Sequence, residues 1–235
     1  MSQVKTPSII IFDVNETLLD LTTLEPVFER IFGDPAMMRD WFAQLVLYSQ
    51  ALTVSGLYAP FGELAGGVLR MVGETEGVAI ADSEVDDLKR HIGSMPALLD
   101  VRPALEKLRD AGFRLVTLTN SPPAASPTPL ERAGISEYFE RSFSVDEVRR
   151  FKPAPETYNM VAQALNVNVT DLCMFACRLW DTIGSQAAGC AAALVKRPGN
   201  AAMRVGDVPV PDIIADDMGQ IVDQIIARWG TSQQT

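Results

Sequence analysis

An aspartate follows a strand-like segment near the start of the chain. Residues 8–12 (Ser-Ile-Ile-Ile-Phe) form a short apolar run that is typical of a buried parallel strand, and Asp13 comes directly after it. In open α/β sheets the reactive groups lie at the carboxyl ends of the strands, so Asp13 is a candidate nucleophile. The simpler alternative is that Asp13 only caps the turn after the strand.

Three later strand-like runs also end near polar residues. These residues are Thr119 and Asn120, Lys152, and Asp181. Because parallel strands end at one edge of a sheet, we expect these groups to lie close to Asp13 and to Thr17, four residues further along. The sequence therefore predicts a polar site at this edge of the sheet.

The single histidine and the three cysteines narrow the possible chemistry. His91 lies in a charged helical segment, which argues against a serine-hydrolase triad or a histidine-rich metal site. Cys173, Cys177 and Cys190 lie in apolar, strand-like surroundings without metal-binding spacing, so we expect buried reduced thiols. The chemistry must therefore depend on carboxylates, lysine and arginine.

The overall composition is that of an acidic globular protein. With 235 residues and a hydrophobic content of 47%, the chain can bury a sizeable core. The net charge of −10 and the lack of a basic stretch argue against nucleic acid or an anionic membrane as a partner, and favour a small soluble ligand. Neither a signal peptide before Ile9 nor an apolar run of about 18 residues is found, which predicts a cytoplasmic protein.

Apolar periodicity divides the chain into two parts. Between residues 21 and 97 apolar residues recur every three or four positions, which predicts helices, with Trp41 and Tyr48 on one apolar face. From residue 98 onward strand-like and helix-like segments alternate, which predicts a parallel sheet covered on both faces. We expect a doubly wound α/β core of residues 1–20 and 98–235, with a helical domain of residues 21–97 inserted. The later core strands are expected at residues 114–118, 139–145, 172–176 and 191–195, and helices around Leu105, at residues 129–134, from Pro155 to Leu165 and at residues 182–189.

The order of the polar residues resembles that of the haloacid dehalogenase superfamily. Members share an aspartate nucleophile in a DxxxT motif, a Ser or Thr after the second motif strand, a lysine and a final acidic motif. The matching residues are Asp13, Thr17, Thr119, Lys152 and Asp181. The resemblance covers essentially the full chain and implies a Rossmann-like core with an inserted cap.

Two positions separate this chain from the phosphatases of the superfamily. Phosphatases need a second aspartate as general acid two residues after the nucleophile, and here Asn15 occupies that position. They also need Mg²⁺, held partly by an acid of the fourth motif, where this chain has Cys177. A hard cation avoids a thiol, so phosphoryl transfer is disfavoured and no metal is expected.

A site without the general acid and without the metal-binding acid is suited to displacement of a halide from carbon. A halide leaves without a proton, and a carboxylate beside Lys152 stays ionised without a metal. The chain resembles the type II L-2-haloacid dehalogenases most closely. The shared residues are Asn120, the Lys152–Pro153 pair, Tyr158 and the Trp180–Asp181 pair.

This resemblance implies a two-step reaction on a 2-haloacid, without a cofactor, in a homodimeric enzyme. Asp13 would displace the halide with inversion to form an ester, and water would then release a D-2-hydroxy acid. Lys152 would hold Asp13, and Asp181 would position or activate the water. Thr17, Thr119 and Asn120 would bind carboxylate oxygens by hydroxyl, amide and backbone N–H groups. The expected substrate-binding residues are Asn15, Phe42, Thr119, Asn120, Tyr158, Arg178 and Trp180.

Structural roles are the alternatives for several of these residues. Lys152 could form only an ion pair at a strand end. Tyr158 could be core packing, and Trp180 a hydrophobic wedge under the sheet. Asn120 could cap the turn before Ser-Pro-Pro.

The chain departs from the family pattern at the halide site. Family dehalogenases carry an arginine on the first long cap helix, and here that position falls on Phe42. Ala176 and Arg178 replace the Ser and Asn that precede the Trp-Asp pair in family members. Arg39 and Arg178 are the two candidates for the missing cation, although Arg178 could instead pair with Asp181 or another acid.

Two other functions fit the same residues. Trp41 and Phe42 could line an apolar pocket for a longer haloacid, or for a strained-ring acid opened by the same carboxylate. The protein could also be a catalytically poor relative that binds a small acid. Halide release from 2-chloropropionate separates these possibilities.

A chelation experiment tests the interpretation of Asn15 and Cys177. We expect halide release to survive EDTA, and added Mg²⁺ to create no phosphatase activity, because the general acid and the hard ligand are both missing. The measurement is halide release and hydrolysis of a small phosphate ester, each with and without chelator. Phosphatase activity that depended on Mg²⁺ and on Asp13 would overturn the dehalogenase interpretation.

Overall fold

The computed structural model describes residues 7–230 of the chain. The strands are β1 (Ile9–Phe12), β2 (Arg114–Thr119), β3 (Arg141–Ser144), β4 (Leu172–Ala176), β5 (Ala191–Val195) and β6 (Ile213–Ala215). The α-helices are α1 (Glu25–Phe32), α2 (Met37–Val54), α3 (Phe61–Thr75), α4 (Asp82–Ile92), α5 (Val101–Asp110), α6 (Pro129–Arg132), α7 (Pro155–Leu165), α8 (Leu179–Ala188) and α9 (Met218–Trp229). Short 3₁₀ helices cover Leu21–Leu24, Ser136–Tyr138, Val145–Glu147 and Val169–Asp171.

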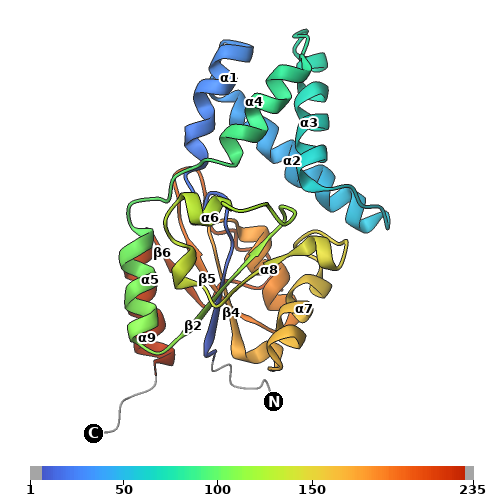
Figure 1. Cartoon of the computed structure of the whole chain (residues 1–235). Helices are drawn as coiled ribbons and strands as arrows, with labels where there is room; N and C mark the ends of the chain where they lie inside the picture. The colour runs from blue at the N-terminus through green and yellow to red at the C-terminus, as the bar shows by residue number, and fades with distance from the viewer. Residues whose placement is uncertain (1–6, 231–235) are drawn as a thin grey trace, which may run out of the picture.

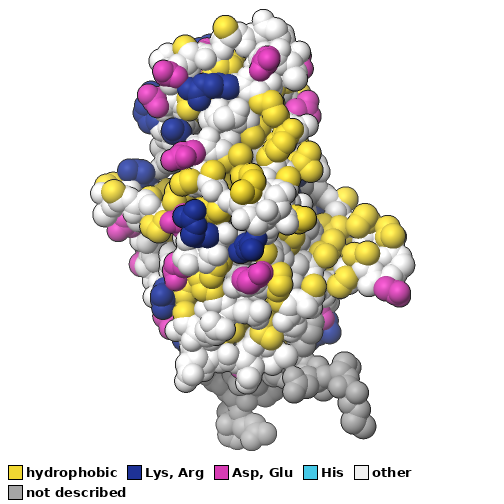
Figure 2. All heavy atoms as spheres, turned by 90° about the vertical axis from the view of Figure 1, so that its right-hand side faces the viewer, with side chains coloured by type: hydrophobic (Ala, Val, Ile, Leu, Met, Phe, Trp, Pro, Cys, Tyr) yellow, Lys and Arg dark blue, Asp and Glu magenta, His cyan; other side chains and the backbone are white. Residues whose placement is uncertain are grey.

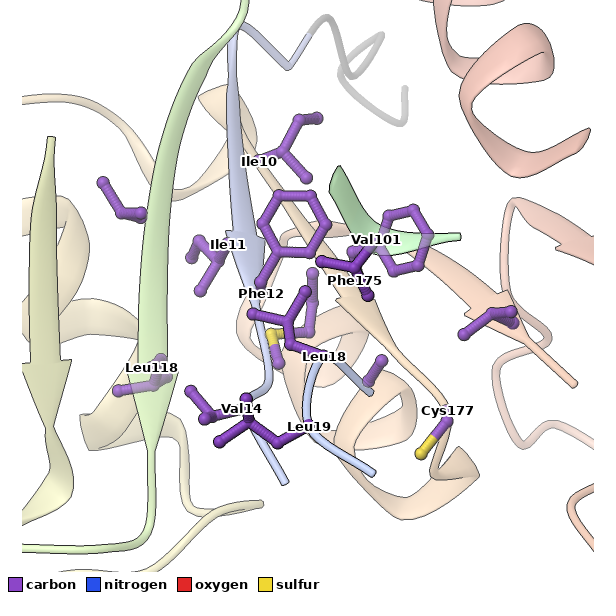
Figure 3. Packing of buried hydrophobic residues seen from close by; sticks show 14 of the residues in the cluster. Ile10, Ile11, Phe12, Val14, Leu18, Leu19, Val101, Leu118, Phe175 and Cys177 are labelled. Atoms are coloured by element: carbon purple, nitrogen blue, oxygen red, sulfur yellow. The ribbon is translucent and has the colours of Figure 1, made fainter. Parts of the chain in front are cut away.

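The strands form one parallel sheet in the order β3-β2-β1-β4-β5-β6. β1 lies in its interior, paired with β2 and β4, and each of its side chains is fully buried. Phe12 stacks on Phe175 of β4 with ring centroids 4.9 Å apart. Both side chains are labelled in Figure 3. A strand that is covered on both faces needs apolar residues at every position, which explains the unbroken run before Asp13.

Helices cover both faces of the sheet, with α5 and α9 on one side and α7 and α8 on the other (Figure 1). α5 buries Leu105 and Leu108, and the chain reverses after it at Gly112. The φ angle of Gly112 is 87°, a conformation that glycine adopts without steric cost. The predicted doubly wound α/β fold is confirmed.

The helices α1 to α4 lie beyond the carboxyl end of the sheet (Figure 1). The chain leaves β1 and returns to α5 through two segments that pair with each other. The amide of Leu98 donates to the carbonyl of Leu18, and the amide of Asp20 to the carbonyl of Pro96, both at 2.9 Å. This pairing anchors the helices next to the end of β1, where Asp13 lies.

One residue of the predicted apolar helix face was placed wrongly. The α2 residues Trp41, Phe42 and Leu45 are buried as expected, but Tyr48 is 40% exposed and Ser49 takes the buried position instead. The buried face continues from Leu45 to Ser49 by a step of four residues, which turns Tyr48 toward solvent. Within residues 7–230, no helix is both long and apolar enough to cross a membrane.

The last strand and helix had no counterpart in the predicted elements. β6 is three residues long and pairs with β5, and α9 follows it. A strand this short carries almost no periodicity, and only its pairing with Ala193, Leu194 and Val195 defines it.

Candidate active site

A buried lysine joins the groups that follow three different strands. Lys152 comes after β3, and its Nζ donates to Asp13 Oδ1 at 2.8 Å, to Asp181 Oδ2 at 2.6 Å and to the carbonyl of Leu118 at 3.0 Å. All three ammonium hydrogens therefore have acceptors. Burial by itself lowers the pKa of Lys152, but the two carboxylates outweigh it and hold the pKa above its ordinary value. Lys152 is thus a cation shared by two acids.

Asp13 has one oxygen on the lysine and the other on a hydroxyl. Thr17 Oγ1 donates to Asp13 Oδ2 at 2.7 Å and accepts from the amide of Cys177 at 3.0 Å. The Asp13 side chain is 12% exposed, whereas that of Lys152 is fully buried. Both carboxylate oxygens of Asp13 therefore accept hydrogen bonds from buried side chains, and the exposed part of the Asp13 side chain borders a cavity.

Asp181 lies on the far side of Lys152 and has no exposed surface. It is in the first turn of α8, where the helix dipole favours a carboxylate. Tyr158 donates its hydroxyl to Asp181 Oδ1 at 2.6 Å. Burial raises the pKa of Asp181 to about 6, while Lys152 and the Tyr158 hydrogen bond act in the opposite direction. Above that pH Asp181 is ionised and can accept a proton.

A glycine allows α8 to approach the lysine. A Cβ atom at Gly184 would lie 2.3 Å from Cβ of Pro153, so only glycine fits against the residue that follows Lys152. Gly184 lies almost one helical turn after Asp181, on the face of α8 that contacts Pro153. The glycine thus sets the distance at which Asp181 meets Lys152.

The second charged pair of the site contains a residue that was not singled out from the sequence. Arg178 Nε donates to Glu16 Oε2, and the guanidinium carbon lies 5.2 Å from the ring centroid of Phe42. Glu16 is buried in a left-handed conformation with φ of 67°. The structure shows the alternative in which Arg178 pairs with an acid other than Asp181. Arg178 nevertheless borders the cavity at Asp13. The only sequence signal for Glu16 is its place inside the DxxxT motif.

Arg39 is directed away from this site. Its Nη2 donates to the carbonyl of Pro198 at 3.3 Å, and the guanidinium lies against Gly199. Arg39 borders neither of the two cavities described below. Of the two candidate replacements for the cap arginine, only Arg178 is near Asp13.

Most of the predicted substrate-binding residues surround a small cavity of about 20 Å³ at Asp13. The predicted residues that border it are Asn15, Phe42, Thr119, Asn120, Arg178 and Trp180. Asn120 also accepts from the amide of Lys152 at 3.0 Å, so it fixes the lysine backbone rather than only capping a turn. Tyr158 differs from the prediction, because it is fully buried and contacts Asp181 instead of the cavity.

A second and larger cavity of about 440 Å³ adjoins the first. The residues that border both cavities are Asn15, Phe42, Phe61 and Thr119. Asp13 borders only the smaller one. An apolar pocket lined by Trp41 and Phe42 was one of the alternatives considered from the sequence, and both residues border the larger cavity. The size of this cavity and the position of Phe61 between the two cavities were not predicted, because they result from contacts between distant segments.

The position expected for a metal-binding acid holds a neutral thiol. Burial raises the pKa of Cys177 well above its ordinary value, and Glu16 and Asp13 act in the same direction. Cys177 Sγ lies 3.5 Å from Glu16 Oε2. Within residues 7–230, no cluster of three or more His, Cys, Asp or Glu side chains could hold a metal ion. This donor set does not fit a hard divalent cation.

The fold and this site define an α/β protein with a buried carboxylate–lysine–carboxylate group at the carboxyl end of its sheet. The chain belongs to the haloacid dehalogenase-like hydrolase family, whose sequence model matches residues 7–189. (S)-2-haloacid dehalogenase 1 of Pseudomonas sp. strain CBS-3 is 28% identical over 185 residues, which cover 76% of this chain and 80% of the relative. (S)-2-haloacid dehalogenase 4A of Burkholderia cepacia is 25% identical over 192 residues, covering 81% and 83%.

Solved structures share the same fold. L-2-haloacid dehalogenase from Xanthobacter autotrophicus, with chloropropionic acid covalently bound, superposes with a TM-score of 0.84 at 22% identity. The match covers 96% of this chain and 100% of that one. The arrangement of core and helices is therefore that of the family.

The Tyr158 hydrogen bond is open to a stability test. A hydrogen bond to a charged group contributes about 1.5–3 kcal/mol, so Tyr158→Phe should lower the free energy of unfolding by roughly that amount at pH 8. The loss should be smaller at pH 5, because the pKa of Asp181 is about 6 and the bond stabilises its ionised form. Urea unfolding at both pH values measures the effect.

Tyr48→Phe is the matched control, since Tyr48 is 40% exposed on α2. It should change the free energy of unfolding by no more than about 0.5 kcal/mol. Equal losses in the two variants, or no pH dependence for Tyr158→Phe, would contradict the assignment.

Proposed function

We propose that this protein is a hydrolase that displaces halide from a small 2-haloalkanoic acid through an ester on Asp13. The observation that carries the proposal is the Asp13 carboxylate, held by Lys152 and Thr17 and open to a cavity bordered by Arg178. The names of the relatives, (S)-2-haloacid dehalogenases, support the same reaction.

In the proposed first step, Asp13 attacks the α-carbon of the substrate. One carboxylate oxygen forms the new C–O bond while the carbon–halogen bond breaks, and the halide leaves with its electron pair. Lys152 donates a hydrogen bond to Asp13 and supplies the positive charge beside it without a metal. Displacement from the opposite side inverts the carbon, so an L-2-haloacid gives a D-2-hydroxy acid.

In the second step, water attacks the carbonyl carbon of the Asp13 ester. The acyl C–O bond breaks, the hydroxy acid leaves with the former Asp13 oxygen, and the water oxygen remains on Asp13. Asp181 is the proposed acceptor of the water proton, because it is ionised above about pH 6 and shares Lys152 with Asp13, and the proton then passes to the leaving alkoxide oxygen, which restores the ionised Asp181. Formation of the ester frees Lys152 from one anion, which shifts its interaction toward Asp181.

The cavity residues would bind the substrate carboxylate and the departing halide. Arg178 supplies the cation, and its pair with Glu16 keeps the guanidinium beside Phe42. Thr119 and Asn120 supply hydroxyl, amide and backbone N–H groups at the end of β2. Asn15 and Trp180 complete the border of the cavity.

We further propose that residues 21–97 act as a cap domain over a core of residues 1–20 and 98–235, and that the enzyme is a homodimer. The exposed side chains of Leu47, Tyr48 and Val54 on α2 are compatible with a partner subunit. The space-filling view in Figure 2 shows hydrophobic side chains gathered on the face that it presents. A cytoplasmic location is proposed because the described residues contain no disulfide.

A single-turnover experiment in water labelled with heavy oxygen tests the proposed function. With enzyme in excess over 2-chloropropionate, we expect the product oxygen to come from Asp13 and to be unlabelled. Mass spectrometry should find the label in the peptide that contains Asp13. Asp13→Asn should abolish turnover with an unchanged circular dichroism spectrum, and direct labelling of the product would exclude the ester mechanism.

The role of Arg178 is tested by substitution. A charge-assisted contact is worth about 1.5–3 kcal/mol, so Arg178→Ala should lower kcat/KM by roughly one to two powers of ten. Arg39→Ala is the control and should leave kcat/KM unchanged, because Arg39 contacts Pro198 instead.

Phe42→Arg tests whether the cation can act from the cap helix. The Arg178 guanidinium lies over the Phe42 ring, so an arginine at position 42 should partly rescue Arg178→Ala. Unchanged kinetics in Arg178→Ala would show that this cation has no part in the reaction.

A further inference from the structure

The unit that follows β2 has a very short helix. α6 has four residues, Pro129–Arg132, whereas α8 after β4 has ten. Prolines at positions 122, 123 and 127 lack an N–H group and disfavour a helical conformation in the residue before them. The helix therefore begins only at Pro129, which occupies its first turn. We call residues 121–129 the proline loop.

The larger cavity lies beside the proline loop. The proline loop, α6 and the carboxyl ends of β2 and β3 form one side of it, with Thr117, Leu130 and Phe143 among the lining residues. The helices α2 and α3 form the other side with Trp41 and Phe61. At about 440 Å³ its volume is within the range of small-molecule sites, roughly 300–1,000 Å³.

This cavity adjoins the site of the proposed reaction. Asn15, Phe42, Phe61 and Thr119 border both the larger cavity and the small one at Asp13. A small cavity of about 20 Å³ has room for the reacting carbon but not for a bulky group attached to it. A large substituent on that carbon would have to extend past these four residues into the larger cavity.

We propose that the larger cavity receives the substituent on the α-carbon, and that the preferred substrates are 2-haloacids with a large apolar substituent, such as a benzyl group or a long alkyl chain. This inference rests on the proposed function and specifies its substrate class. The departure at position 42 fits it, because Phe42 gives both cavities an apolar wall. Each methylene buried there should raise kcat/KM roughly fourfold.

Gly62 offers a way to fill the cavity without disturbing the fold. It lies in α3 and borders the cavity, and a Cβ atom there would meet nothing within 4 Å. Gly62→Leu should therefore place its side chain in the cavity. Gly67→Leu is the matched control, because Gly67 lies on the same helix with an equally open Cβ position but borders neither cavity.

The experiment compares halide release from 2-chloropropionate and from 2-chloro-3-phenylpropionate. We expect wild type and Gly67→Leu to prefer the phenyl substrate by at least tenfold in kcat/KM. Gly62→Leu should lower this preference at least tenfold. A wild type that prefers 2-chloropropionate, or a Gly62→Leu variant with an unchanged preference, overturns the proposal.

Binding of unreactive acids separates this proposal from the proposed function. Calorimetry should find that 3-phenylpropionate binds wild type more tightly than propionate does, and that Gly62→Leu loses the difference. If no haloacid is turned over but this binding difference is found, the proposed function fails and the cavity assignment stands. If 2-chloropropionate is hydrolysed but 3-phenylpropionate binds no better than propionate, the function stands and the cavity assignment is wrong.

Discussion

A buried ammonium group between two carboxylates is the interaction on which the rest of the structure depends. Lys152 Nζ contacts Asp13 and Asp181, and its side chain has no contact with solvent. Removing three charges from water is costly, and their attraction offsets this only with good geometry and further hydrogen bonds. The hydroxyls of Thr17 and Tyr158 provide those bonds, one for each carboxylate.

This requirement explains features that are far apart in the chain. Asp13 needs the buried strand β1 to hold it at the sheet edge, and Asp181 needs the start of α8. α8 reaches the lysine because Gly184 allows contact with Pro153. The two acids differ in exposure, since Asp13 borders a cavity and Asp181 does not. Asp13 is thus the carboxylate that a small molecule in the cavity can contact, whereas Asp181 is enclosed by protein.

The part of the site around Arg178 combines one ion pair with apolar cavity walls. Here Arg178 is held by Glu16 and an aromatic ring, and the cavities are bordered by apolar residues of α2 and α3. The proline loop borders the larger of the two cavities. In the proposed function, Lys152 and its two carboxylates would determine the reaction. The apolar cavity walls would determine the size of the substrate.

The sequence by itself determined the α/β core, its helical insertion and the residues that meet at the sheet edge. Such features follow from local patterns, namely apolar runs, helical periodicity and polar residues at strand ends. Only the tertiary structure decided that Tyr158 contacts Asp181, that Arg178 pairs with Glu16, that Tyr48 is exposed and that a large cavity adjoins the small one at Asp13. These depend on how distant segments pack in three dimensions, and residue spacing along the chain does not encode side-chain direction across such contacts.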